Sequence, residues 1–88
     1  MVFRVDEKVL LKVSQDRRCP SALRESIRDL LLLLENRRHE LMGRYIARVF
    51  MCAYEPLDDA YWSGHAGPDC ELAEAVLDAV QYDGGWDG

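Results

Sequence analysis

The sequence predicts a mainly α-helical protein, a small helical bundle with one long or kinked central helix. Two stretches, 21–54 and 69–82, repeat apolar residues at steps of three and four, which places them on one side of a helix. The chain has 88 residues, enough for a single small domain over 1–88 with a modest core.

The central stretch 21–54 would be roughly 50 Å long as one helix, although the expected radius of gyration is only roughly 12 Å. Its apolar pattern lapses for one turn after Leu34, so we expect a break or sharp kink near 36–40. An unbroken rod that pairs with a second copy stays open, because Leu34 and Leu41 keep the same phase. The apolar members of the stretch are Leu23, Ile27, Leu30, Leu31, Leu34, Leu41, Met42, Tyr45, Ile46, Val49, Phe50 and Ala53.

The segment 2–14 supports two interpretations. Its odd positions are mostly apolar and include several valines, which would suit two short strands of a β-hairpin around Asp6-Glu7-Lys8. Val5, Val9 and Val13 also recur at steps of four, which suits a helix capped by Asp6. We favour the helix, because an isolated two-stranded hairpin is only marginally stable.

The ends of the helices follow from caps and breakers. We expect Ser21 to cap the central helix and Pro56 to end it, with a single further turn over 57–62. The run of glycine and proline at 64–68 predicts a loop, followed by a last helix over 69–82 with Asp69 as its cap. The tail 83–88 is expected to be loose.

Composition argues against several classes of protein. No apolar run is long enough for a membrane span and the start lacks a signal peptide, so we expect a cytoplasmic protein with reduced cysteines. No spacing matches a metal site, and the acids near Cys70 do not favour a nucleophilic role for it. We therefore expect a non-enzymatic protein with no catalytic residues, no metal and no cofactor.

Charge is unevenly distributed along the chain. Residues 1–48 hold eleven basic and seven acidic residues, a net charge of +4, whereas 49–88 hold nine acids and no Lys or Arg, a net charge of −9. An acidic region of this kind repels the phosphate backbone and attracts basic surfaces. The expected partner is a basic protein, without direct nucleic-acid or membrane binding.

The candidate partner-binding residues are acidic residues together with aromatic residues that lie outside the apolar stripes. Glu71, Glu74 and Asp78 share one side of the last helix, opposite its apolar side. Aromatic side chains beside charges are typical of the residues that contribute most to protein interfaces. The full set is Glu55, Asp58, Asp59, Tyr61, Trp62, Asp69, Glu71, Glu74 and Asp78.

The segment Val49-Phe-Met-Cys-Ala-Tyr-Glu-Pro-Leu-Asp-Asp, with the following loop and the acidic helix 69–81, resembles the second half of the colicin D-type immunity proteins. The resemblance implies a small acidic helical bundle that covers the active site of a basic tRNA-cleaving toxin, its carboxylates standing in for RNA phosphates. It carries a binding role onto Glu55, Asp58, Asp59, Glu71, Glu74 and Asp78. The alternating pattern of 3–13 and the Arg37-Arg38 pair depart from that family's pattern.

These observations favour an immunity protein that blocks a nuclease toxin. A phage-encoded anti-defence inhibitor of the anti-CRISPR kind needs the same acidic surface and remains an alternative. A homodimeric structural or adaptor protein is a third possibility, although the run Leu30–Leu34 is broader than a coiled-coil seam. We expect a monomer or a weak homodimer.

Overall fold

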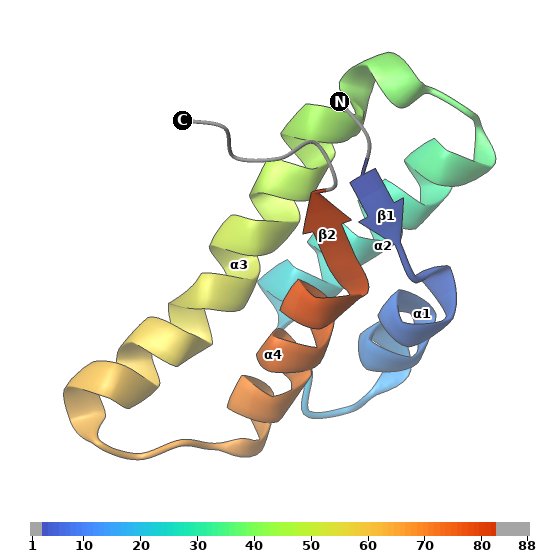
Figure 1. Ribbon diagram of the computed structural model, residues 1–88. Coiled ribbons are helices and arrows are strands. Elements are labelled where there is room, and N and C mark those ends of the chain that lie inside the picture. Colours follow the sequence, from blue (N-terminus) through green and yellow to red (C-terminus); the bar gives the residue numbers. More distant parts are fainter. Residues whose placement is uncertain (1–2, 83–88) are drawn as a thin grey trace, which may run out of the picture.

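The computed structural model describes residues 3–82, and the tail predicted over 83–88 lies outside this range. Within it the chain forms four α-helices and two short strands (Figure 1). In order, they are β1 (Phe3–Val5), α1 (Glu7–Gln15), α2 (Ser21–Glu35), the 3-10 turn η1 (His39–Leu41), α3 (Met42–Ser63), α4 (Pro68–Ala79) and β2 (Val80–Tyr82). The prediction of a mainly α-helical bundle is confirmed.

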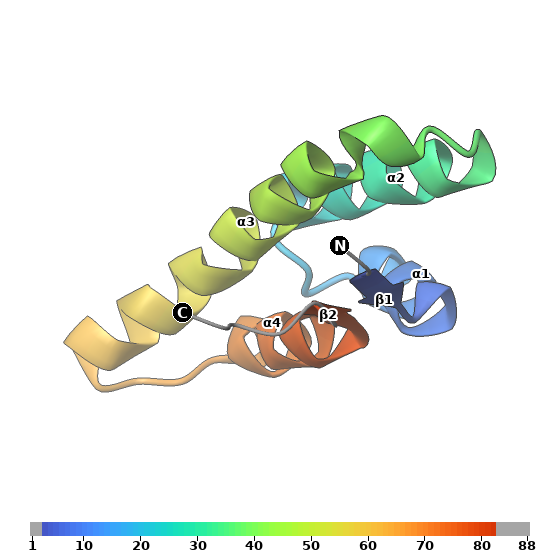
Figure 2. The same cartoon turned by 45° about the horizontal axis from the view of Figure 1, so that its top comes forward.

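The helices lie in two layers, with α2 and α3 in one and α1, α4 and the strands in the other (Figure 2). Each helix contacts the next around a closed ring, from α1 through α2 and α3 to α4 and back to α1. The molecule is flat, with extents of 37 × 34 × 17 Å. The shortest extent, 17 Å, corresponds to two layers of helices. The interior therefore consists of a single layer of side chains between them.

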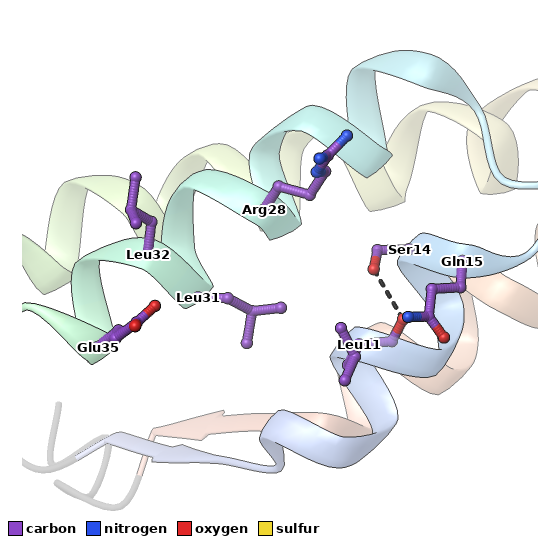
Figure 3. Close-up of a pocket in the computed structure, with 7 residues that line it drawn as sticks. All are labelled: Leu11, Ser14, Gln15, Arg28, Leu31, Leu32 and Glu35. Carbon is purple, nitrogen blue, oxygen red and sulfur yellow. Dashed lines mark hydrogen bonds between the residues drawn. The ribbon is translucent and has the colours of Figure 1, made fainter.

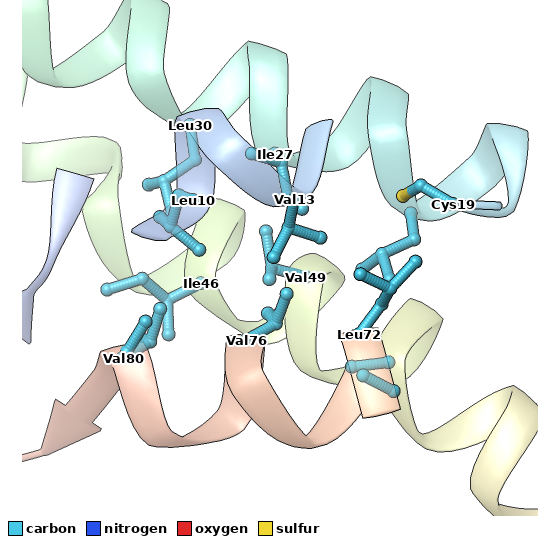
Figure 4. Close-up of a cluster of buried hydrophobic side chains, with 14 of the residues drawn as sticks. Leu10, Val13, Cys19, Ile27, Leu30, Ile46, Val49, Leu72, Val76 and Val80 are labelled. Carbon is cyan, nitrogen blue, oxygen red and sulfur yellow. The ribbon is translucent and has the colours of Figure 1, made fainter. Parts of the chain in front are cut away.

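The core lies between these layers and draws on every helix (Figure 4). Burial of each large aliphatic side chain contributes roughly 1.5–3 kcal/mol, so this cluster dominates the stability of the fold. Its members include Leu10, Val13, Leu23, Ile27, Leu30, Ile46, Val49, Leu72, Val76 and Val80.

A tight chain reversal separates α2 from α3, and the expected break near 36–40 is confirmed. Arg37 takes the left-handed conformation, with φ of 56°. Its N–H donates to the carbonyl of Leu34 at 3.1 Å, and the N–H of Arg38 donates to the carbonyl of Leu33 at 3.2 Å. This pair of hydrogen bonds is the Schellman motif that ends many helices. An unbroken rod over the whole stretch is therefore excluded.

The start of the chain combines both interpretations of 2–14. The helix is confirmed as α1, and the Asp6 carboxylate accepts a hydrogen bond from the N–H of Val9 at 3.3 Å, as expected of its cap. The local hairpin is wrong: β1 pairs antiparallel with β2, with Phe3 opposite Tyr82. The alternating pattern does mark a strand, but its partner lies at the far end of the sequence.

The prediction that Pro56 ends the central helix is wrong, since α3 continues to Ser63. Proline costs one backbone hydrogen bond in a helix interior, but its fixed φ suits the helix. Pro56 is buried, and its carbonyl accepts a hydrogen bond from the Cys70 thiol at 3.4 Å. The helix ends instead at Gly64, whose φ of 75° favours glycine.

The predicted helix caps Ser21 and Asp69 are also wrong. Pro20 and Gly67 occupy these cap positions, and α4 begins at Pro68, where the missing N–H of proline costs nothing. The last helix ends at Ala79 because the chain then extends into β2.

Candidate functional site

The side of α3 that points away from the core carries exposed apolar and charged residues. Met51 is 74% exposed, and Tyr54 is also exposed, although both are large and apolar. They lie opposite the buried residues Ile46, Val49 and Ala53 of the same helix. We call this surface the outer face of α3 and define it by Arg44, Arg48, Met51, Tyr54, Glu55, Asp58 and Trp62, all exposed.

The C-terminal end of α3 presents two aromatic rings to solvent. Tyr61 is 78% exposed and Trp62 is 82% exposed, and their rings touch edge to face with centroids 5.3 Å apart. The last turns of α3 extend beyond the end of α2 (Figure 2). Exposed, rigid aromatics of this kind are the usual anchors of protein interfaces.

The outer face of α4 is acidic. Glu71, Glu74 and Asp78 are exposed and lie opposite the buried residues Leu72 and Val76. Asp69 is half-buried in the first turn, where a carboxylate interacts favourably with the helix dipole. This face therefore presents three carboxylates and no basic side chain of its own helix.

The structure arranges the candidate residues in two groups. Glu55, Asp58 and Trp62 share the outer face of α3, with Asp59 and Tyr61 at its edges. The carboxylates of α4 form the second group. Because α3 and α4 contact each other and both turn their apolar sides to the core, the two groups point outward on different sides of the molecule.

Ion pairs distinguish the two halves of the chain. Arg18 pairs with Asp16, Arg38 with Glu40 and Arg48 with Asp29, so three of the seven acids of the first half have a basic partner. Within residues 3–82, the acids from Glu55 to Asp78 form no such ion pair. Their carboxylates remain available to a basic partner.

One basic group does approach the acidic helix. Arg18 lies in the loop between α1 and α2, and its pKa is raised mainly by the hydrogen-bonded Asp16 carboxylate and more weakly by the charge of Glu71. Hydrogen bonds from the Arg18 guanidinium, and a further one from its backbone N–H, lower the pKa of Asp16 to about 2. The first turn of α4 therefore borders a neutralised charge pair rather than a free cation.

An open groove of about 460 Å³ lies between α1 and α2 (Figure 3). Leu11 and Leu32 line it, and Leu32 is 57% exposed. Arg28 and Glu35 stand along its α2 side, so its polar lining carries both signs of charge. This groove was not predicted from the sequence, although Leu11 and Leu32 are apolar residues that fall outside the two helical stripes.

Reactive side chains do not converge in the structure. Burial raises the pKa of the Cys19 thiol, and the Cys70 thiol is buried and bonded to Pro56, whereas His65 is exposed. Among the residues that the structure describes, no group of three or more metal-binding side chains could hold an ion. No helix within 3–82 is long and apolar enough to cross a membrane.

Comparison of the chain with protein-family models, with curated proteins and with solved structures finds no match.

Proposed function

We propose that this chain is a non-enzymatic inhibitor that binds and neutralises a basic protein, most specifically an immunity protein for a nuclease toxin. The observation that carries the proposal is the set of carboxylates from Glu55 to Asp78, all exposed except the half-buried Asp69. They lack ion pairs among the described residues and are not interrupted by Lys or Arg.

Electrostatics supports a basic partner. A nuclease active site carries positive charge to bind phosphates, so a surface of carboxylates is attracted to it at long range. Such steering raises the association rate and weakens as salt rises. The acids of α3 and α4 point outward on different sides, so they suit a partner that wraps around the end of α3 and reaches α4.

The aromatic end of α3 supports tight rather than merely electrostatic binding. Charged rims contribute mainly to rate and specificity, whereas buried aromatics contribute most of the affinity. Trp62 and Tyr61 stand beside Asp58 and Asp59, which is the combination of an apolar anchor and a charged rim.

A test would use the tagged chain to retrieve partners from lysate of its native host, with identification by mass spectrometry. The test variant Glu71→Lys/Glu74→Lys/Asp78→Lys reverses the outer face of α4. The control variant Glu7→Lys/Glu25→Lys/Glu35→Lys reverses three exposed acids on α1 and α2, so both variants have the same net charge.

We expect a basic nucleic-acid enzyme to bind the wild type and the control but not the test variant, which should lose several kcal/mol of binding free energy through repulsion. The purified partner should lose its nuclease activity at one equivalent of the wild-type chain. Equal retention of the partner by all three proteins would contradict the proposal. An active defence complex in place of a toxin would favour the anti-defence alternative.

A further inference from the structure

The outer face of α3 contains a second periodic stripe that this chain does not cover. Its residues follow one another at steps of four and three, which keeps them on one side of the helix from its first turn to its last. A continuous face of this kind can lie along a second helix over its whole length. The stripe consists of Arg44, Arg48, Met51, Glu55, Asp58 and Trp62, all exposed.

Charge along this stripe changes sign at its centre. Arg44 and Arg48 precede Met51, and Glu55 and Asp58 follow it. In a parallel pair of such helices, Arg44 would meet Arg44 and Asp58 would meet Asp58. In an antiparallel pair, each arginine instead meets a carboxylate of the other copy within one turn, and Met51 lies near the two-fold axis.

Beside the stripe, small residues in the first half of α3 are complementary in size to large residues in its second half. Gly43 and Ala47 are small and lie in the first half of α3, whereas Tyr54 and Tyr61 lie on the same edge in its second half. Antiparallel pairing sets the tyrosines of one copy against the small residues of the other. A Cβ added at Gly43 would meet nothing within 4 Å, so this part of the surface is open.

We propose that the outer face of α3 binds the same face of a second copy of this chain, antiparallel and about a two-fold axis near Met51. One guanidinium nitrogen of Arg48 is held by Asp29 at 3.0 Å, which orients the side chain and leaves its other donors for a carboxylate. In this register Trp62 faces the 3-10 turn η1 of the other copy, about one helical turn from its Arg44, and an indole face attracts a guanidinium within reach.

The size of the contact suits a weak dimer. The stripe from Arg44 to Trp62 is about 27 Å long at about 1.5 Å per residue, and a single pair of helices of this length buries less than a standard interface. We expect a dissociation constant on the order of 10 µM.

The inference does not rest on the proposed inhibitor function. Arg44 and Arg48 belong to the dimer alone, and Glu71, Glu74 and Asp78 belong to the basic partner alone. Failure of one proposal can therefore be distinguished from failure of the other, although both use Glu55, Asp58 and Trp62.

The first test is sedimentation equilibrium of the wild type and two variants. Met51→Lys places two like charges near the two-fold axis and should raise the dimer dissociation constant by at least about tenfold. Leu32→Lys, on the exposed side of α2, is the matched control and should leave it unchanged. A wild type that stays monomeric up to about 1 mM, or a Met51→Lys protein that dimerises as well as the wild type, would overturn the proposal.

The second test exchanges the charges within one chain. Arg44→Glu/Arg48→Glu makes the whole stripe acidic and should abolish dimers. Adding Glu55→Arg/Asp58→Arg restores the pattern in reverse order and should restore the dimer. All four positions are exposed, so the helix should fold in each variant. If the four-fold variant remained monomeric while the wild type dimerised, the antiparallel pairing would be refuted.

Discussion

The two sides of α3 differ sharply although they belong to one helix. On the inner side Ile46 is 1% exposed, and Val49 and Ala53 are fully buried. On the outer side Met51 and Trp62 are also large and apolar, but they are exposed to solvent and have charged residues as neighbours. Apolar residues on the inner side are explained by the core. Those on the outer side contribute nothing to the core, which is why we assign them to binding.

The largest expected effect tests this division directly. Ile46→Asp would bury a carboxylate without a partner and should cost several kcal/mol, enough to unfold a domain of this size. Met51→Asp, half a turn or so away on the outer side, should leave the thermal transition nearly unchanged. Thermal melts followed by circular dichroism check both, and a cooperative melt in Ile46→Asp would show that the inner side is not the core.

The next effect concerns the outer side and binding. Trp62→Ala should weaken binding of the basic partner by roughly 2 kcal/mol, mostly through faster dissociation, because a buried aromatic anchor is lost. Leu32→Ala, which also removes an exposed apolar side chain, should have little effect. Surface plasmon resonance separates the two rates. A loss confined to the association rate would argue against an anchoring role for Trp62.

A smaller effect concerns the reversal that gives α3 its two sides. Arg37 is strained by its left-handed conformation, which costs most residues roughly 1 kcal/mol and glycine almost nothing. Arg37→Gly should therefore raise the free energy of unfolding by up to about 1 kcal/mol. Arg38→Gly, one residue later, should not. Destabilisation by Arg37→Gly in urea denaturation would mean that α2 and α3 are joined differently.

The smallest effect concerns the Arg18–Asp16 ion pair of the first half, which has no counterpart among the acids from Glu55 to Asp78. The pKa of Asp16 is lowered from 3.8 to about 2 by Arg18, so its contribution to stability is present above pH 3.8 and is lost as pH falls towards 2. Asp16→Asn should remove this part of the pH dependence. Urea denaturation across that range should show the two proteins converging at the acid end. Parallel curves would rule out the pairing in solution.

The helices were predictable because their determinants are local. The stripe through Ile46 and Val49 and the lapse after Leu34 lie within a few residues of the structures that they determine. The pairing of β1 with β2 was not predictable, since it joins segments from opposite ends of the sequence. The end of the helix was wrongly predicted at Pro56. The backbone hydrogen bond that proline loses is evident from the sequence, whereas the burial of Pro56 and its hydrogen bond with Cys70 depend on the tertiary structure.

The candidate site shows the same limit. The exposure of Tyr61 and Trp62 follows from their position outside the apolar stripes, as the sequence indicates. The outer face of α3 is not predictable from the sequence, because Pro56 indicates the end of a helix and so separates Asp58 and Trp62 from the periodic pattern before it. Whether the acids of α3 and α4 share one side is likewise a question of helix packing that residue spacing does not answer.

The pairing of β1 with β2 brings the first and last described segments of the chain together. Since α4 contacts α1 and the strands beside them pair, the helices form a ring that the backbone closes everywhere except at this ladder. A circularly permuted chain, opened in the loop around Gly64 and joined by a linker across the original ends, would preserve every helix contact. The order of the helices along the sequence is thus only one of several that would encode the same fold.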